Sequence, residues 1–193
     1  MGEERLQESR DTGTIRERKR QIIKVCERGR KMFFMQDKNK KVFEDYFSEI
    51  QEDMVAICLE YVEKRAERIY IYCSFENGMI SSGFFYKVNG KIVKKNQLNN
   101  VIADGQKEYD VSISRQKGAI NIINDDIKAL KRLCQEHQRE MPTQIKLVYD
   151  LISNRLNADY SYEIMFSNDQ KKTAYDVLDE WYQSEKNTIC DSN

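Results

Sequence analysis

Two Asn-Gly pairs, Asn77-Gly78 and Asn89-Gly90, constrain the fold of this chain more than any other feature of its sequence. Each pair follows a run rich in β-branched and aromatic residues. Because Asn-Gly readily supplies the two positive φ angles of a type I′ turn, each pair is expected to join two adjacent antiparallel strands. The spacing therefore predicts a three-stranded antiparallel meander, with strands over residues 68–75, 79–88 and 91–94.

A second pair of strands is predicted further along the chain, over residues 143–151 and 156–164, on either side of a turn at Ser153-Asn154. Both runs alternate apolar and polar side chains, which places the two kinds on opposite faces of a strand. In the last strand we expect a buried face and a solvent face, as antiparallel sheets commonly have. The buried face would carry Leu156, Ala158, Tyr160, Tyr162 and Ile164, and the solvent face Asn157, Asp159, Ser161 and Glu163.

Apolar residues at three- and four-residue steps predict helices over residues 15–35, 41–66, 114–140 and 169–184. Runs of adjacent strands with helices around them indicate an α+β fold. We expect an antiparallel sheet of about five strands, the three-stranded meander plus a hairpin, covered on one face by helices and preceded by an extra N-terminal helix. The predicted organisation is a basic N-terminal helical extension (1–38), an α+β domain (39–185) and a flexible tail (186–193).

The net charge of zero conceals an uneven distribution of charge along the chain. Residues 1–41 hold 13 Lys and Arg against 7 Asp and Glu, whereas residues 42–193 hold 19 against 25. A basic leader of net +6 thus precedes an acidic body of net −6. Such an asymmetry bears on the choice of partner and on encounter rates, and not on the fold.

The composition of the sequence also indicates the cellular compartment of the protein. The sequence has no run of about 18 apolar residues, the mark of a transmembrane helix, and no apolar segment near its start that could act as a secretory signal. Its five cysteines are odd in number and scattered, a pattern typical of reduced thiols in the cytoplasm. We therefore expect a cytoplasmic protein with no membrane partner.

Residues suited to catalysis or metal binding are sparse in the sequence. His137 is the only histidine, and it lies in the apolar register near the end of its helix, where a packed or dipole-facing role is expected. A structural zinc site needs several His or Cys ligands at short spacing, and a phosphate loop needs clustered glycines. The sequence therefore predicts no enzyme: no catalytic residues, no metal and no cofactor.

Acidic residues in the last third of the chain form the candidate binding surface. Charge on a solvent face is commonly a solubilising surface and nothing more. Interpreted functionally, the same charge is a complementary patch that steers a basic partner. The candidate interface residues are Asp159 and Glu163 on the last strand, with Asp169, Asp176, Asp179 and Glu180 on or beside the final helix.

The aromatic strands and the second hairpin resemble those of YezG-type immunity proteins. The similarity lies in residues 68–72, 84–86, 142–150 and 156–163, in the turn at Ser153-Asn154, and in the later Asp179-Glu180-Trp181. It covers about residues 41–184 and leaves residues 1–38 outside. The resemblance implies a bacterial antitoxin of an LXG-type polymorphic toxin system, in a family with no defined catalytic residues. The implied partner is a cognate protein toxin, which we expect to be a basic nuclease domain whose active site the antitoxin occludes.

Other classes of function stay open at this point. The basic N-terminal helix would suit a nucleic-acid-binding regulator, because Lys and Arg neutralise phosphates. Glu17 and Glu27 interrupt its basic run, however, which makes nucleic acid the less favoured partner. A protein-binding adaptor that uses this helix, or self-association into a homo-oligomer, also fits the pattern. An enzyme of unrecognised type would need a deep polar pocket with perturbed carboxylates.

Overall fold

The computed structural model describes residues 41–190 of the chain. The helix expected over residues 15–35 lies outside them. Two compact units divide the chain, residues 1–42 and 43–193, and every helix and strand described below belongs to the second unit.

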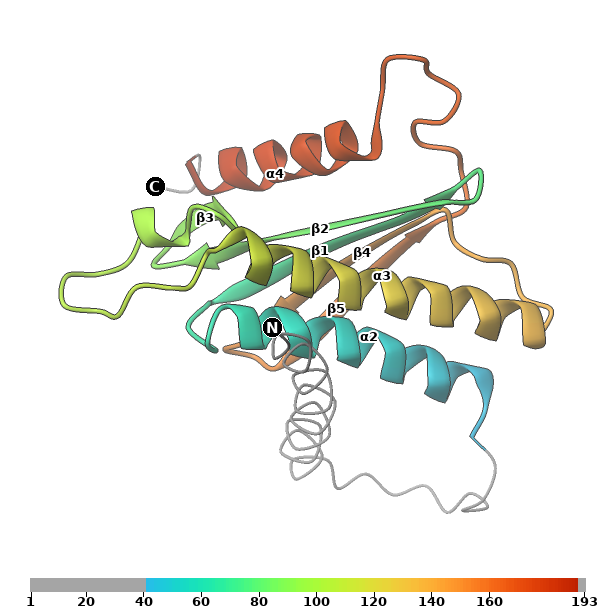
Figure 1. Ribbon diagram of the computed structural model, residues 1–193, viewed down its shortest axis with the longest axis horizontal. Coiled ribbons are helices and arrows are strands. Elements are labelled where there is room, and N and C mark those ends of the chain that lie inside the picture. The colour runs from blue at the N-terminus through green and yellow to red at the C-terminus, as the bar shows by residue number, and fades with distance from the viewer. Residues whose placement is uncertain (1–40, 191–193) are drawn as a thin grey trace, which may run out of the picture. The chain divides into compact units, whose positions relative to one another are not determined.

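A five-stranded antiparallel sheet in the order β3-β2-β1-β4-β5 forms the middle of this unit (Figure 1). Its strands are β1 (Arg68–Glu76), β2 (Met79–Val88), β3 (Lys91–Lys94), β4 (Gln144–Asp150) and β5 (Arg155–Ser161). Both Asn-Gly turns have the expected positive φ angles, 48° and 77° at Asn77-Gly78 and 49° and 76° at Asn89-Gly90. The meander and the second hairpin are confirmed, and the hairpin joins the meander through β1 and β4.

Helices α2 (Phe43–Tyr61) and α3 (Ile113–Glu136) lie on one face of the sheet (Figure 1). They cover side chains such as Ile69, Ile71 and Leu147, which are fully buried in the largest of three hydrophobic clusters. Removal of this apolar surface from water is the main favourable term in folding.

Both helices end earlier than predicted. The Arg115 guanidinium donates to the carbonyl oxygens of Glu60 (3.0 Å) and Tyr61 (3.5 Å) at the end of α2. Past the end of α3, Gln138 takes the left-handed conformation at a φ of 53°. The predicted ends at residues 66 and 140 are therefore too late. Contacts that end a helix cannot be read from the spacing of its apolar residues.

Helix α4 (Ala174–Cys190) lies on the opposite face of the sheet, so helices cover both faces (Figure 1). The expectation of one covered face was wrong. Under α4, Tyr70 and Phe85 stack with ring centroids 4.6 Å apart, and Trp181 and Tyr182 meet Phe85 edge-on at 5.1 and 5.4 Å. Aromatic side chains thus point from both faces of the central strands, which is the physical reason that these strands need cover on both sides.

The start of α4 also differs from the prediction. Residues 165–167 form a loop, because the buried carboxylate of Glu76, at the end of β1, accepts the backbone N–H groups of Met165 (2.9 Å), Phe166 (3.3 Å) and Ser167 (3.0 Å). The helix begins after Thr173, whose side chain and that of Asp176 cap each other's backbone N–H groups. At its other end α4 continues to Cys190, through most of the segment expected to be a flexible tail.

Candidate functional site

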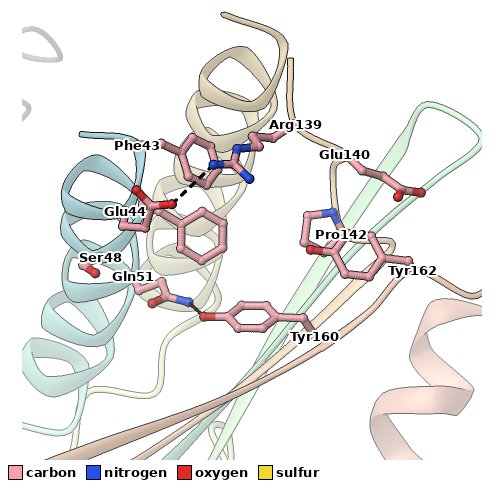
Figure 2. A pocket seen from close by; sticks show the side chains of 10 residues that line it. Phe43, Glu44, Ser48, Gln51, Arg139, Glu140, Pro142, Tyr160 and Tyr162 are labelled. Atoms are coloured by element: carbon pink, nitrogen blue, oxygen red, sulfur yellow. Dashed lines mark hydrogen bonds and ion pairs between the residues drawn. The ribbon is translucent and has the colours of Figure 1, made fainter. Parts of the chain in front are cut away.

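An open groove lies where the first half of α2, the link from α3 to β4, and the end of β5 meet (Figure 2). Its volume is about 490 Å³. Figure 2 shows Phe43 and Gln51 of α2 on one side, Pro142 and Tyr162 on the other, and Tyr160 reaching across between them. The lining residues are Phe43, Glu44, Phe47, Ser48, Gln51, Arg139, Glu140, Pro142, Tyr160 and Tyr162.

A continuous row of rings lies along the α2 side of the groove. Phe43 and Phe47, one helical turn apart, have ring centroids 5.6 Å from each other. The Phe43 ring also meets His137 edge-on at 5.5 Å, and the Phe47 ring meets Tyr160 edge-on at 5.5 Å. Edge-to-face contacts at these distances add to the area that aromatic rings bury. The row therefore gives the groove a firm aromatic wall.

A few polar groups accompany the rings. Gln51, only 6% exposed, donates from its Nε2 to the Tyr160 hydroxyl. Burial raises the pKa of Tyr160 above its ordinary value, so the phenol stays protonated at neutral pH. At the rim, Arg139 forms an ion pair with Glu44 at 3.6 Å and lies over the Phe43 ring at 5.5 Å. An apolar wall with a small number of placed polar groups is the usual composition of a binding site.

At the groove and just past it, large apolar side chains stay in contact with solvent at the end of β5. Tyr160 is 37% exposed, Tyr162 51% and Ile164 49%. We expected these three side chains on a buried face. Tyr160 does point to the face that α2 covers, but β5 is the outermost strand and α2 covers it only in part. Tyr162 and Ile164 come after the end of the strand. The strand therefore offers an exposed aromatic surface where a buried one was predicted.

The outer edge of β5 has no neighbouring strand among the described residues. Phe75 donates its N–H to the Thr143 carbonyl, and Leu151 donates to that of Glu67, so the odd-numbered residues of β4 bond to the β1 side. The even-numbered residues of β4 then bond to β5, where the register pairs them with odd-numbered residues. It follows that the free edge carries the backbone N–H and C=O groups of Leu156, Ala158 and Tyr160.

The six predicted interface residues do not form one patch. Asp179 binds Lys94 of β3 at 2.6 Å, Glu180 binds Lys172 at 2.8 Å, and Asp176 serves in the cap of α4. The hydrogen bond from Lys94 lowers the pKa of Asp179, and those from Thr173 lower the pKa of Asp176. These three carboxylates are thus engaged within the chain.

The other three predicted residues lie in the second hairpin and the loop after it. Asp169 accepts the N–H of Lys171 at 2.8 Å. Asp159 is exposed on β5, and Glu163 is exposed next to Tyr162 of the groove. Four strand steps of about 4.8 Å put about 19 Å between β5 and β3, the strand that Asp179 contacts. Of the six, Asp159 therefore lies on the edge strand, on the face opposite the groove, and Glu163 lies beside the groove.

The aromatic wall was missed because its residues also fit a core pattern. Phe43 and Phe47 are predicted on the apolar face of α2, and His137 is predicted to be packed or to face the helix dipole. His137 does lie at the C-terminal cap of α3, but it is exposed.

Residues 41–190 contain neither a metal-ligand cluster nor a membrane-spanning helix. No group of three His, Cys, Asp or Glu side chains in this range is arranged to hold a metal ion. In the same range, no helix combines the length and apolar character needed to cross a membrane.

Fold and surface together define an α+β protein in which helices cover both faces of an antiparallel sheet and an open aromatic groove adjoins a sheet edge. No protein-family model matches the chain, and no curated protein matches it. The resemblance to YezG-type immunity proteins therefore rests only on the strand and turn residues and on Asp179-Glu180-Trp181.

Proposed function

We propose that this chain is an immunity protein, which binds a cognate secreted toxin in the cytoplasm of the producing cell and neutralises it. The observation that carries the proposal is the exposed aromatic surface at the end of β5, where Tyr160, Tyr162 and Ile164 adjoin the groove. Contiguous aromatic surface in contact with water marks a site of protein–protein interaction more often than it marks a solvent face.

The resemblance in the strands and the second hairpin supplies the kind of partner. A nuclease toxin binds a polyanion, so a basic surface is expected on it, and the acidic body of this chain would speed its encounter with such a surface. Bound at the groove, the chain would occlude the toxin's active site by covering it. This mechanism needs no reacting group on the immunity protein.

A protection experiment tests this function. The C-terminal domain encoded by the gene immediately upstream would be expressed in bacteria with and without the full chain. We expect growth arrest without the chain and normal growth with it, and a stable complex of the two proteins on size exclusion. A toxic domain that the chain neither binds nor neutralises would contradict the proposal.

A further inference from the structure

The free edge of β5 and the groove lie together, and both lack a described occupant. Leu156, Ala158 and Tyr160 direct their backbone groups outward along the edge, and the side chains of the same three residues point to the α2 side of the sheet. An exposed row of N–H and C=O groups is a template for a further strand. The same strand would then pass the groove that Tyr160 and Tyr162 line.

We propose that β5 accepts an extended segment of a protein partner as a sixth strand of the sheet, with an apolar or aromatic side chain of that segment in the groove. This inference rests on the proposed function in that the partner is a protein. Main-chain hydrogen bonds would supply affinity, and the groove would select the side chain, as in other cases of strand addition.

The alternation of an added strand decides which side chains the partner needs. A residue that points to the α2 side meets the rings of Phe47, Tyr160 and Tyr162 at the groove. Its neighbours in the segment point to the other face, where Asp159 is exposed across from them. Opposite charges on directly facing residues of two strands are stabilising. The segment is therefore expected to carry Lys or Arg next to its apolar residue.

Charge at the rim of the groove favours the same partner. Arg139 is engaged by Glu44, whereas Glu140 and Glu163 stand exposed at the groove and beside Tyr162. The rim is therefore acidic on balance, which suits a basic protein segment and opposes the phosphates of a nucleic acid.

The length of β5 is sufficient for a stable addition. The strand has seven residues, at or above the usual length of strands in globular proteins. At the other edge of the sheet, β3 has only four residues and Lys94 ties it to α4. Strand addition is accordingly assigned to β5 and not to β3.

A peptide selection on the full chain tests the inference. Phage that display random nine-residue peptides are selected on the protein, and the enriched peptides are synthesised and titrated by fluorescence anisotropy. We expect enrichment of peptides with an apolar or aromatic residue beside Lys or Arg. A library that yields no binder, or binders without this pattern, would contradict the inference.

Two variants with matched controls locate the contact. Ala158→Pro removes an N–H group from the free edge without removing a bond to β4, and it should weaken peptide binding at least about tenfold, whereas Ala158→Ser should leave it unchanged. Tyr162→Ser should weaken binding about tenfold as well, against Ile152→Ser on the exposed β4–β5 turn as control. If Ala158→Pro does not fold, the Tyr162 pair decides.

Three outcomes would separate the inference from the proposed function. Peptide binding that survives both Ala158→Pro and Tyr162→Ser overturns strand addition. A dimer in sedimentation that Ala158→Pro dissociates would show that a second copy takes the edge, and would also overturn it. Cells that Ala158→Pro still protects as well as the parent chain would leave immunity intact but remove its link to β5.

Discussion

At the scale of single residues, the carboxylate of Glu76 determines where the sheet ends and the last helix begins. The side chain is 2% exposed, and its carboxylate accepts the three backbone N–H groups at residues 165–167. Burial alone would raise the pKa of Glu76, but together the hydrogen bonds from Met165, Ser167 and Phe166 lower it below its ordinary value. The charged form is thus the one that the fold stabilises.

Replacing this carboxylate by an amide tests its role. Glu76→Gln should lower the free energy of unfolding at pH 7 by about 1–3 kcal/mol, because bonds to a charged acceptor are replaced by weaker ones. Urea denaturation measures the change. Glu140→Gln, at an exposed site, is the control. Its free energy of unfolding should lie within about 0.5 kcal/mol of that of the parent chain. Equal stability of the Glu76→Gln variant and the parent at pH 7 would show that the loop does not depend on the charge.

The pH dependence of the same group has a definite sign. Since the folded-state pKa lies below the ordinary value of 4.5, the contribution of Glu76 is fully present above pH 4.5 and is lost as the pH falls through the lowered value. The stability difference between the parent and Glu76→Gln should therefore shrink on acidification below pH 4.5. Denaturation curves at a series of pH values measure this difference. A difference that stays constant on acidification would contradict this sign.

Asp150 gives a second test at this scale. Hydrogen bonds from the backbone N–H of Ser153 (2.9 Å) and from Arg68 Nε (2.8 Å) lower its pKa to about 2. NMR titration of the carboxyl carbon should show this value. In Arg68→Gln the pKa should rise but stay below 3.8, the ordinary value, because the Ser153 donors remain. An unshifted pKa in the parent chain would refute the geometry of the β4–β5 turn.

At the scale of elements, the close approach of α4 to β2 depends on a single glycine. A Cβ atom on Gly83 would lie 2.3 Å from Cδ2 of Leu178, far inside van der Waals contact. A side chain at position 83 would therefore force the end of Leu178 to move. The cost of filling it depends on how readily the end of Leu178 can move.

A double-mutant cycle measures this approach. Gly83→Ala should lower the free energy of unfolding by about 1–3 kcal/mol, as for other overpacked sites. In a Leu178→Ala background the same change should cost less, since the clashing atom is gone, and the coupling should exceed about 0.5 kcal/mol. Additive effects in thermal or urea denaturation would show that the two positions are not in contact.

Most elements could be predicted from the sequence, because their signals are local. The two Asn-Gly turns fix the meander through backbone geometry, and β2 and β3 have the predicted bounds. The hairpin of β4 and β5 followed from alternation. Helix ends and the start of α4 could not be predicted, because Arg115 and Glu76 determine them from distant parts of the chain.

The site was harder to predict than the fold. Alternation places Tyr160 on the α2 side of the sheet, but it does not tell how far α2 extends over β5, and that extent decides whether the ring is buried. The acidic residues of α4 are conspicuous in the sequence, yet two of them form ion pairs. Asp179 pairs with Lys94, which is 85 residues away in the chain, and Glu180 pairs with Lys172, which is 8 residues away. Exposure and pairing are tertiary properties, so a one-dimensional pattern does not contain them.

At the scale of the whole molecule, the two edges of the sheet differ in charge and in cover. Asp179 and Lys94 neutralise each other at the β3 edge. At the β5 edge, Asp159 is exposed on the face opposite the groove, and Glu163 is exposed next to Tyr162 of the groove. Of the two edges, the β5 edge therefore presents exposed carboxylates that are in no ion pair within the described residues.

Charge reversal distinguishes this edge from the rest of the surface. The double variant Asp159→Lys, Glu163→Lys should slow association with the upstream-encoded toxin domain about threefold to tenfold at low salt, because surface charges act mainly on encounter. Asp104→Lys, Glu108→Lys makes the same change of net charge in an exposed loop that contacts Glu63 and Arg65, just after the end of α2, and should have a smaller effect. Stopped-flow kinetics at two salt concentrations gives both rates, and equal slowing would point to net charge alone.

Hydrogen exchange of the toxin complex gives the most direct measurement of the central claim, that a protein partner binds along β5 and its groove. The amides of Leu156, Ala158 and Tyr160 face outward in the free chain, so they should exchange rapidly there and become protected when the toxin domain binds. The amides of α4 should change little. Protection confined to α4, with no change at these three positions, would contradict the account.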